Sequence, residues 1–160
     1  MVHKISKEVL EMLKIAGAIV LCLLAGIIGS LFTVTGPASW YSQLIKPSFN
    51  PPNWIFAPVW TILYILMGIA LYLAVKNKIG KKAIIIFASQ LVLNALWTII
   101  FFGMHNPFLA FMEIILLWIA ILWTIIEFRK KSRAASYLLI PYILWVSFAS
   151  ILNLAIYFLN

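Results

Sequence analysis

Five long apolar runs constrain the fold of this chain more than any other feature of its sequence. They cover approximately residues 15–34, 57–75, 83–102, 108–126 and 136–159. At 1.5 Å per residue, a helix of each length crosses a hydrocarbon core of ~30 Å. Only a helix satisfies its own backbone within lipid, and the alternation of barrel strands is not seen. We therefore predict an all-α integral membrane bundle of five transmembrane helices, folded as a single domain over residues 1–160.

The composition excludes a soluble domain, and the positions of the charges exclude a nucleic-acid-binding role. The chain is 65% hydrophobic and 10% charged, against about 45–50% and 25% in soluble domains. Its net charge is +8, but threading five spans places 11 of the 12 basic residues on one side of the membrane and leaves Lys46 on the other. The positive-inside rule then predicts a cytoplasmic N-terminus, with the first loop and the C-terminus outside. The expected partner of the basic clusters is the lipid bilayer.

The N-terminal residues, the single cysteine and the two histidines support further expectations. Residues 1–14 place Ile5, Val9, Met12 and Leu13 on one helical face, which predicts an interfacial turn or two before the first span. We expect the apolar run at 15–34 to be that span, because it is longer than the core of a typical cleaved signal peptide. The single cysteine, Cys22, allows no intramolecular disulfide. The two histidines fall on opposite sides of the membrane, so we expect no metal site.

The segment 40–68 is the least ordinary part of the sequence. Its first half is dense in prolines and amphipathic aromatics, including Trp40 and Trp54, which is not typical of a regular helix. Its second half is apolar, and Pro58 is expected to kink or restart the helix there. In that half Trp60, Tyr64 and Gly68 share one helical face. We predict a ligand site where the tryptophan-rich loop meets this helix.

Polar and aromatic side chains within the spans are expensive to bury, and they mark candidate binding faces. The third run contributes Gln90, Asn94, Trp97 and Phe101 at helical spacing. The fifth contributes Tyr142, Trp145, Ala149 and Asn153, and the fourth contributes Glu113. Pooled with Trp60 and Tyr64, these faces predict an aromatic cavity for a flat apolar ligand, open toward the tryptophan-rich loop. The candidate ligand-binding residues are Trp40, Trp54, Trp60, Tyr64, Gln90, Asn94, Trp97, Glu113, Tyr142, Trp145, Ala149 and Asn153.

Structural roles for the same residues stay open. Gln90 and Asn94 are equally typical of interhelical hydrogen bonds, worth about 0.6–2 kcal/mol each. Glu113 is more often a structural hydrogen-bonding group than a proton relay. Tryptophans near the ends of spans form interfacial belts, whereas Trp60 and Trp145 lie too deep for that role, which favours binding.

At these residues the chain resembles the TspO/MBR family, the translocator or tryptophan-rich sensory proteins once called peripheral-type benzodiazepine receptors. The resemblance rests on three motifs in order, which are WYSQLIKPSFNPPNWIFAPVWTILYILMG, QLVLNALWTIIFF and PYILWVSFASILN. It covers essentially the whole chain. It implies a five-helix bundle, commonly a homodimer, that binds porphyrins such as protoporphyrin IX under the first loop without a covalent cofactor. Some members also bind sterols or isoquinoline-type ligands.

The resemblance also assigns roles by position. Trp40, Trp60, Asn94, Trp145 and Ala149 match pocket positions, and Glu113 matches an acidic position of the fourth helix. Trp60 and Trp145 match the tryptophans associated with light-dependent porphyrin degradation, which makes them the candidate photo-oxidation residues.

Two departures from the family pattern limit what carries over. Leu154 and Phe158 stand where the sterol motif of animal members has Tyr and Arg, so that motif is broken. Ile85 and Ser89 replace a packing glycine pair of the animal third helix, which leaves the dimer surface open.

Three functions follow as expectations. The first is a membrane receptor or carrier for tetrapyrroles in the cytoplasmic membrane. The second is an enzyme-like, light- and oxygen-dependent breakdown of porphyrin. The third is a regulatory or stress-sensing protein that acts through partners. Ordinary hydrolytic chemistry is not expected, since the chain has four carboxylates and neither histidine lies near a plausible nucleophile.

Overall fold

The computed structural model describes residues 2–160, with side chains from Ser6 onward, so the predictions that involve His3 and Ile5 lie outside the described side chains. The elements are α1 (Val2–Ser30), α2 (Trp40–Gln43), α3 (Asn53–Lys76), α4 (Lys81–Thr98), the π-helix η1 (Ile99–Gly103), α5 (Pro107–Arg129), α6 (Arg133–Tyr137) and α7 (Ile140–Leu159). Five of the helical segments are long and apolar enough to cross a membrane. The predicted all-α bundle of five transmembrane helices is confirmed.

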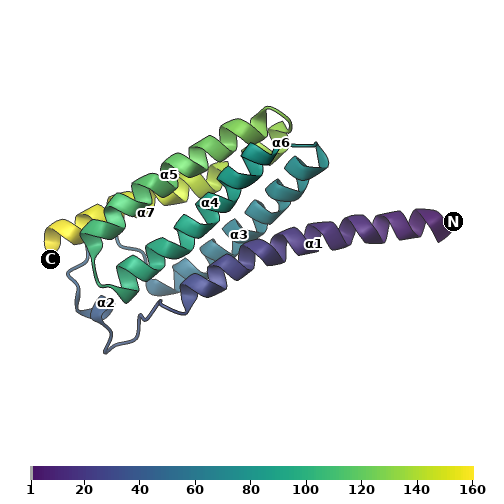
Figure 1. Ribbon diagram of the computed structural model, residues 1–160. Coiled ribbons are helices and arrows are strands. Elements are labelled where there is room, and N and C mark those ends of the chain that lie inside the picture. Colours follow the sequence, from purple (N-terminus) through teal and green to yellow (C-terminus); the bar gives the residue numbers. More distant parts are fainter. Residues whose placement is uncertain (1) are drawn as a thin grey trace.

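The long helices pack against one another along their lengths, except that α1 diverges from the rest at one end (Figure 1). Helix α5 packs against α4 and α7, while α1 packs against both α3 and α4. The short helix α6 joins α5 to α7 and contacts α3. Helix α1 leaves the others toward its N-terminus, whereas its C-terminal half stays within the bundle (Figure 1). The loop of residues 31–52 carries α2 and is called the α2 loop below. It closes the end of the bundle opposite the α3–α4 turn (Figure 1).

The first span ends earlier than predicted, at Ser30 instead of residue 34. The chain leaves the helix in a tight turn, with the Phe32 amide bonded to the Gly29 carbonyl at 3.1 Å. The residues that follow, Thr33, Val34 and Thr35, are β-branched and lose side-chain freedom in a helix. Hydropathy alone could not show this helix end, because Thr33 and Val34 do not interrupt the mean hydropathy of the run before them.

The predictions for Pro58 and for the fifth span need correction. Helix α3 does not restart at Pro58, because it runs unbroken from Asn53 to Lys76. A proline this near the start removes one backbone bond and leaves the rest of the ladder intact. The fifth span is not one continuous helix over 136–159: α6 ends at Tyr137 and α7 begins at Ile140, with Pro141 in its first turn.

The third span ends in a π-helix that the sequence analysis did not anticipate. Residues Ile99–Gly103 form η1 directly after α4. A π-turn adds a residue to the turn and rotates the side chains that follow, and such turns are frequent at functional sites. Here it turns both Phe101 and Phe102 toward the loop that carries α2, where they pack on Tyr41 with ring centroids 6.3 Å and 5.3 Å away.

Glycines set the close approach of α1 to its neighbours. A Cβ added to Gly68 would collide with the backbone of Ile19, and one added to Gly26 would collide with the ring of Tyr64. A Cβ on Gly29 would lie 3.1 Å from the Thr98 hydroxyl. Gly26 and Gly29 of the first span therefore serve packing within the bundle.

This packing predicts an effect at Gly68 that another glycine should not share. Gly68→Ala should lower the thermal midpoint of the protein in detergent by several degrees, because a backbone atom of Ile19 cannot yield as a flexible side chain would. Gly17→Ala is the control, since nothing lies within 4 Å of a Cβ there and alanine favours the helix. Equal midpoints for the two variants would contradict the α1–α3 contact described here.

Candidate functional site

A cavity of about 420 Å³ lies between α1, α3, α4 with η1, and α7, at the end of the bundle covered by the α2 loop. Its walls come from the C-terminal half of α1, the N-terminal half of α3, the C-terminal half of α4 with η1, and the stretch of α7 from Trp145 to Ile156. The lining residues are Leu23, Gly26, Ile27, Gly29, Ser30, Thr33, Thr35, Tyr41, Asn53, Phe56, Ala57, Trp60, Thr61, Tyr64, Asn94, Trp97, Thr98, Phe101, Phe102, Trp145, Ala149, Leu152, Asn153 and Ile156. Every one of them is uncharged.

Aromatic rings dominate the walls. Trp60 stacks on Tyr64 along α3, with centroids 5.7 Å apart and planes at 28°. Trp97 stacks on Phe101 across the junction of α4 and η1, at 5.1 Å and 18°. Trp145 faces them from α7, with Phe56 of α3 against its edge at 6.0 Å. The flat faces of these rings favour a flat apolar guest.

A chain of buried hydrogen bonds holds three helices together beneath the cavity. The Tyr64 hydroxyl donates to Asn94 Oδ1, and Asn94 Nδ2 donates to the Tyr142 hydroxyl at 3.0 Å. The Tyr142 hydroxyl donates in turn to Gln90 Oε1 at 2.9 Å, and Gln90 Nε2 contacts the Met67 sulfur at 3.8 Å. Tyr64 and Asn94 belong to the cavity wall, whereas Gln90 and Tyr142 support it from behind. This hydrogen-bond chain orients the polar groups of Tyr64 and Asn94 in the cavity wall.

Two tryptophans of the wall differ in how their indole N–H groups are satisfied. Trp97 Nε1 donates to Asn153 Oδ1 at 3.0 Å, and Asn153 Nδ2 donates to the Pro107 carbonyl at 2.7 Å. Trp145 Nε1 is buried and has no hydrogen-bond partner among the described residues. A buried donor without a partner is costly, and in native proteins it calls for an explanation.

The α2 loop closes the cavity on the side where the sequence placed it. Tyr41 is buried against Phe101 and Phe102, with Lys46 Nζ 4.6 Å from the centre of its ring. Burial raises the pKa of its phenol, so Tyr41 stays neutral in this apolar setting. At the far end of the loop, Asn160 pairs with the backbone of Ile45 through two hydrogen bonds of 2.9 Å and 3.0 Å. The loop is thus fixed to both η1 and the end of α7.

The structure brings seven of the twelve predicted ligand-binding residues to the cavity wall. They are Trp60, Tyr64, Asn94, Trp97, Trp145, Ala149 and Asn153. Gln90 and Tyr142 lie behind that wall. Trp40 stacks on His105 at 4.6 Å and meets Phe101 edge-on, so it touches the back of a lining ring and not the cavity itself.

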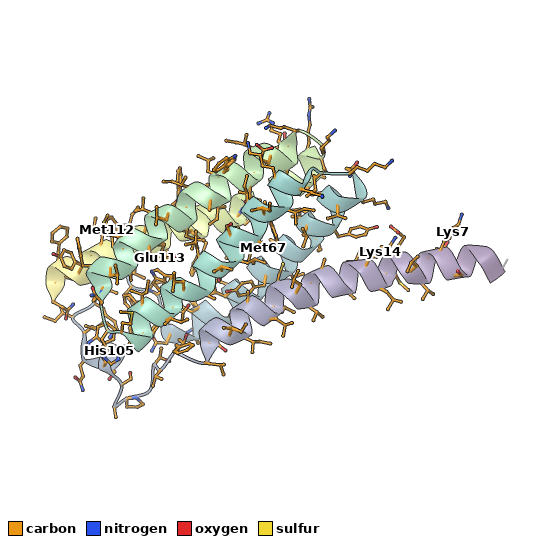
Figure 2. The ribbon with its side chains drawn as sticks, viewed as in Figure 1. Lys7, Lys14, Met67, His105, Met112 and Glu113 are labelled. Atoms are coloured by element: carbon orange, nitrogen blue, oxygen red, sulfur yellow. The ribbon has the colours of Figure 1, made fainter. Side chains whose placement is uncertain are left out.

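The other two predicted residues lie away from the cavity. Trp54 is 73% exposed in the first turn of α3, which suits an interfacial residue. Glu113 is 5% exposed within α5, marked in Figure 2, and neither carboxylate oxygen has a partner among the described residues. Spacing placed both on plausible faces but could not show which neighbour each face meets.

Sequence reasoning missed the wall supplied by α1 and the loop. Leu23, Gly26 and Ile27 line the cavity, as do Thr33 and Tyr41. The α1 positions look like ordinary packing residues, and Thr33 and Tyr41 look like ordinary loop residues. Phe56 could have been found, because it lies four residues before Trp60 on the same helical face.

Known proteins similar to this chain agree with the bundle and its motifs. The family model "TspO/MBR family" matches residues 18–159. The chain is 49% identical to "Tryptophan-rich protein TspO" of Chlorobaculum tepidum, covering 94% of this chain and 98% of that one. It is 45% identical to the protein of the same name in Archaeoglobus fulgidus, at 94% and 99% coverage. It is 36% identical to "Translocator protein" of Homo sapiens, at 81% and 80% coverage. This five-helix, multi-pass membrane protein belongs to the TspO/MBR family.

Proposed function

We propose that the protein is a membrane receptor or carrier that binds porphyrins, such as protoporphyrin IX or a related tetrapyrrole, in the aromatic cavity. The observation that carries the proposal is the cavity itself: about 420 Å³, walled by three tryptophans and free of charged side chains along its lining. A tetrapyrrole is flat, aromatic and largely apolar, so it would exchange water for ring contacts on both of its faces. The resemblance to porphyrin-binding members points to the same class of ligand.

The unpartnered Trp145 N–H supports a ligand that is not purely hydrocarbon. A tetrapyrrole carries acceptor atoms in addition to its apolar ring, and an acceptor near Trp145 Nε1 would satisfy a donor that is buried without a partner. Asn94 and Tyr64 offer further polar atoms on the same wall. A ligand bound here would therefore be oriented by a few polar contacts within an apolar site.

A second function is light-dependent breakdown of the bound porphyrin. The observation that favours it is that Trp60 and Trp145, from different helices, both line the cavity. Indole rings are among the readily oxidised side chains of this wall. Molecular oxygen would be the oxidant and light the energy source, so the two functions differ in whether illumination yields a product.

One titration separates these two functions. Purified protein in detergent is titrated with protoporphyrin IX in the dark while tryptophan fluorescence quenching is followed, and the complex is then illuminated in air. Saturable quenching without a new absorbing species supports the receptor. A new species that requires the protein supports breakdown. The absence of saturable quenching would contradict both.

Ala149 should set the space available to the ligand. It lines the cavity one turn after Trp145 on α7, so Ala149→Leu should weaken protoporphyrin IX binding by about tenfold or more while leaving the thermal midpoint nearly unchanged. Ala88→Leu, on the exposed face of α4, is the matched control and should bind normally. A destabilised Ala149→Leu variant with unchanged affinity would mean that this face is packed core.

Substitutions of Trp60 and Trp145 should change dark binding affinity and photoproduct formation to different extents. Phenylalanine retains most of the ring contact but lacks the oxidisable indole, so Trp60→Phe and Trp145→Phe should each weaken dark binding by less than about tenfold, or ~1.4 kcal/mol. If breakdown occurs, either change should reduce the photoproduct much more than it reduces affinity. Trp123→Phe is the control, because Trp123 lies under Lys82 away from the cavity. If a variant with alanine at both positions binds protoporphyrin IX in the dark as well as the parent does, these tryptophans do not contribute to the binding site.

We propose an orientation with the N-terminus and both basic loops in the cytoplasm, and the α2 loop and C-terminus outside. The 11-to-1 division of basic residues supports it. In a Cys22→Ala background, Gln43→Cys should react with an impermeant thiol reagent in intact spheroplasts, and Lys131→Cys should react only after lysis. Both side chains are exposed, so the two sites are comparable. The opposite pattern would invert the orientation.

A further inference from the structure

The N-terminal third of α1 reaches beyond the rest of the bundle. With 29 residues, α1 is about 44 Å long, well over a hydrocarbon core of ~30 Å. Glu11 meets the end of α3, where its carboxylate accepts from the Tyr72 hydroxyl at 2.5 Å and lies 3.4 Å from Lys76 Nζ. Residues before Glu11 therefore extend past α3, as the divergent N-terminal end of α1 in Figure 1 shows. We call residues 6–14 the arm.

The arm is amphipathic, and its apolar side is not covered by the bundle. Val9, Leu10, Met12 and Leu13 are 43%, 51%, 63% and 63% exposed. At 100° per residue these four lie within an arc of about 160°. Glu11 lies opposite and is the residue bonded to α3, so the polar side of the arm faces the bundle and the apolar side faces away.

The same end of the protein carries a large excess of positive charge. Ten lysine and arginine residues of the described part gather there, on the arm, the α3–α4 turn and the α5–α6 turn, together with three carboxylates. Glu11 pairs with Lys14 and Lys76, and Glu127 pairs with Lys82 and Lys130. Among the described residues, six cations are left without an ion-pair partner: Lys7, Lys78, Lys81, Arg129, Lys131 and Arg133. Figure 2 shows Lys7 and Lys14 along the arm.

We propose that the arm and the two basic turns form a docking surface for anionic phospholipid headgroups. The arm lies obliquely in the leaflet, with its apolar side among the upper acyl segments and Lys7 level with the lipid phosphates. The lysines of the α3–α4 turn hold headgroups beside it. A bilayer surface presents negative charge directly next to hydrocarbon, which is the combination that the two sides of this arm require. An acidic protein surface would match the cations but would leave the apolar side exposed.

Spin labels on the full-length protein test where the arm lies. In a Cys22→Ala background, single cysteines at Leu10, Leu13, Glu8 and Val92 carry the label in nanodiscs of phosphatidylcholine with or without phosphatidylglycerol. With phosphatidylglycerol, labels at Leu10 and Leu13 should be accessible to oxygen and shielded from a water-soluble relaxant, whereas a label at Glu8 should show the reverse. Val92, 66% exposed on α4, is the control and should remain lipid-facing in both discs.

Charge substitutions test why the arm lies there. The fraction of phosphatidylglycerol that half-shields the Leu10 label should rise by about threefold or more in a variant that combines Lys7→Gln, Lys78→Gln and Lys81→Gln, and added salt should mimic that change. Lys46→Gln, at the other end of the bundle, should have no effect.

Three outcomes would overturn the proposal. In the first, the Leu10 and Leu13 labels remain exposed to water in every disc. In the second, their shielding is the same with and without phosphatidylglycerol. In the third, shielding appears only in discs that hold two copies and is accompanied by dipolar coupling between the labels, which would assign the apolar side to a second copy of the chain.

Discussion

The buried hydrogen-bond chain centred on Tyr142 is the interaction on which the rest of the structure depends. It links α3, α4 and α7 through Tyr64, Asn94 and Gln90, in a setting where lipid offers no alternative partners. Each bond is worth only about 0.6–2 kcal/mol, but an unpaired group in the same place would cost more. These hydrogen bonds therefore select one mutual arrangement of the three helices. In that arrangement the cavity lies next to the hydrogen-bonded groups.

The cavity is bordered by the close contacts of α1 with its neighbours. Near the other end, Gly68 lets α1 approach α3 until a single added carbon would meet the backbone of Ile19. Toward the α2 loop, Gly26 and Gly29 still bring α1 against Tyr64 and Thr98, and the rings of Trp60 and Trp145 line the space beside these contacts. The π-turn at Ile99–Gly103 then brings Phe101 and Phe102 under the loop, and Tyr41 closes the space from above. Close helix contacts and ligand space therefore lie side by side along the same interface.

Much of the site could be predicted from residues that are expensive to place in lipid. Asn94 and Asn153 stood out because amides need partners there, and their helical spacing located Trp97 and Trp145 on the same faces. The same rule misled at Glu113, which is buried in α5 away from the cavity. Spacing defines the face of a helix that a residue occupies, but it does not identify the helix that this face will meet.

The sequence by itself determined the five spans, the helical class, the basic end and the aromatic faces, because these depend on hydropathy and on the period of a single helix. The tertiary structure alone decided that α1 forms a wall of the cavity, that Trp54 faces outward and that Trp40 lies behind Phe101. It also decided which glycines touch another helix. These features depend on how helices are rotated about one another, which packing and buried hydrogen bonds set and which no single stretch of sequence encodes.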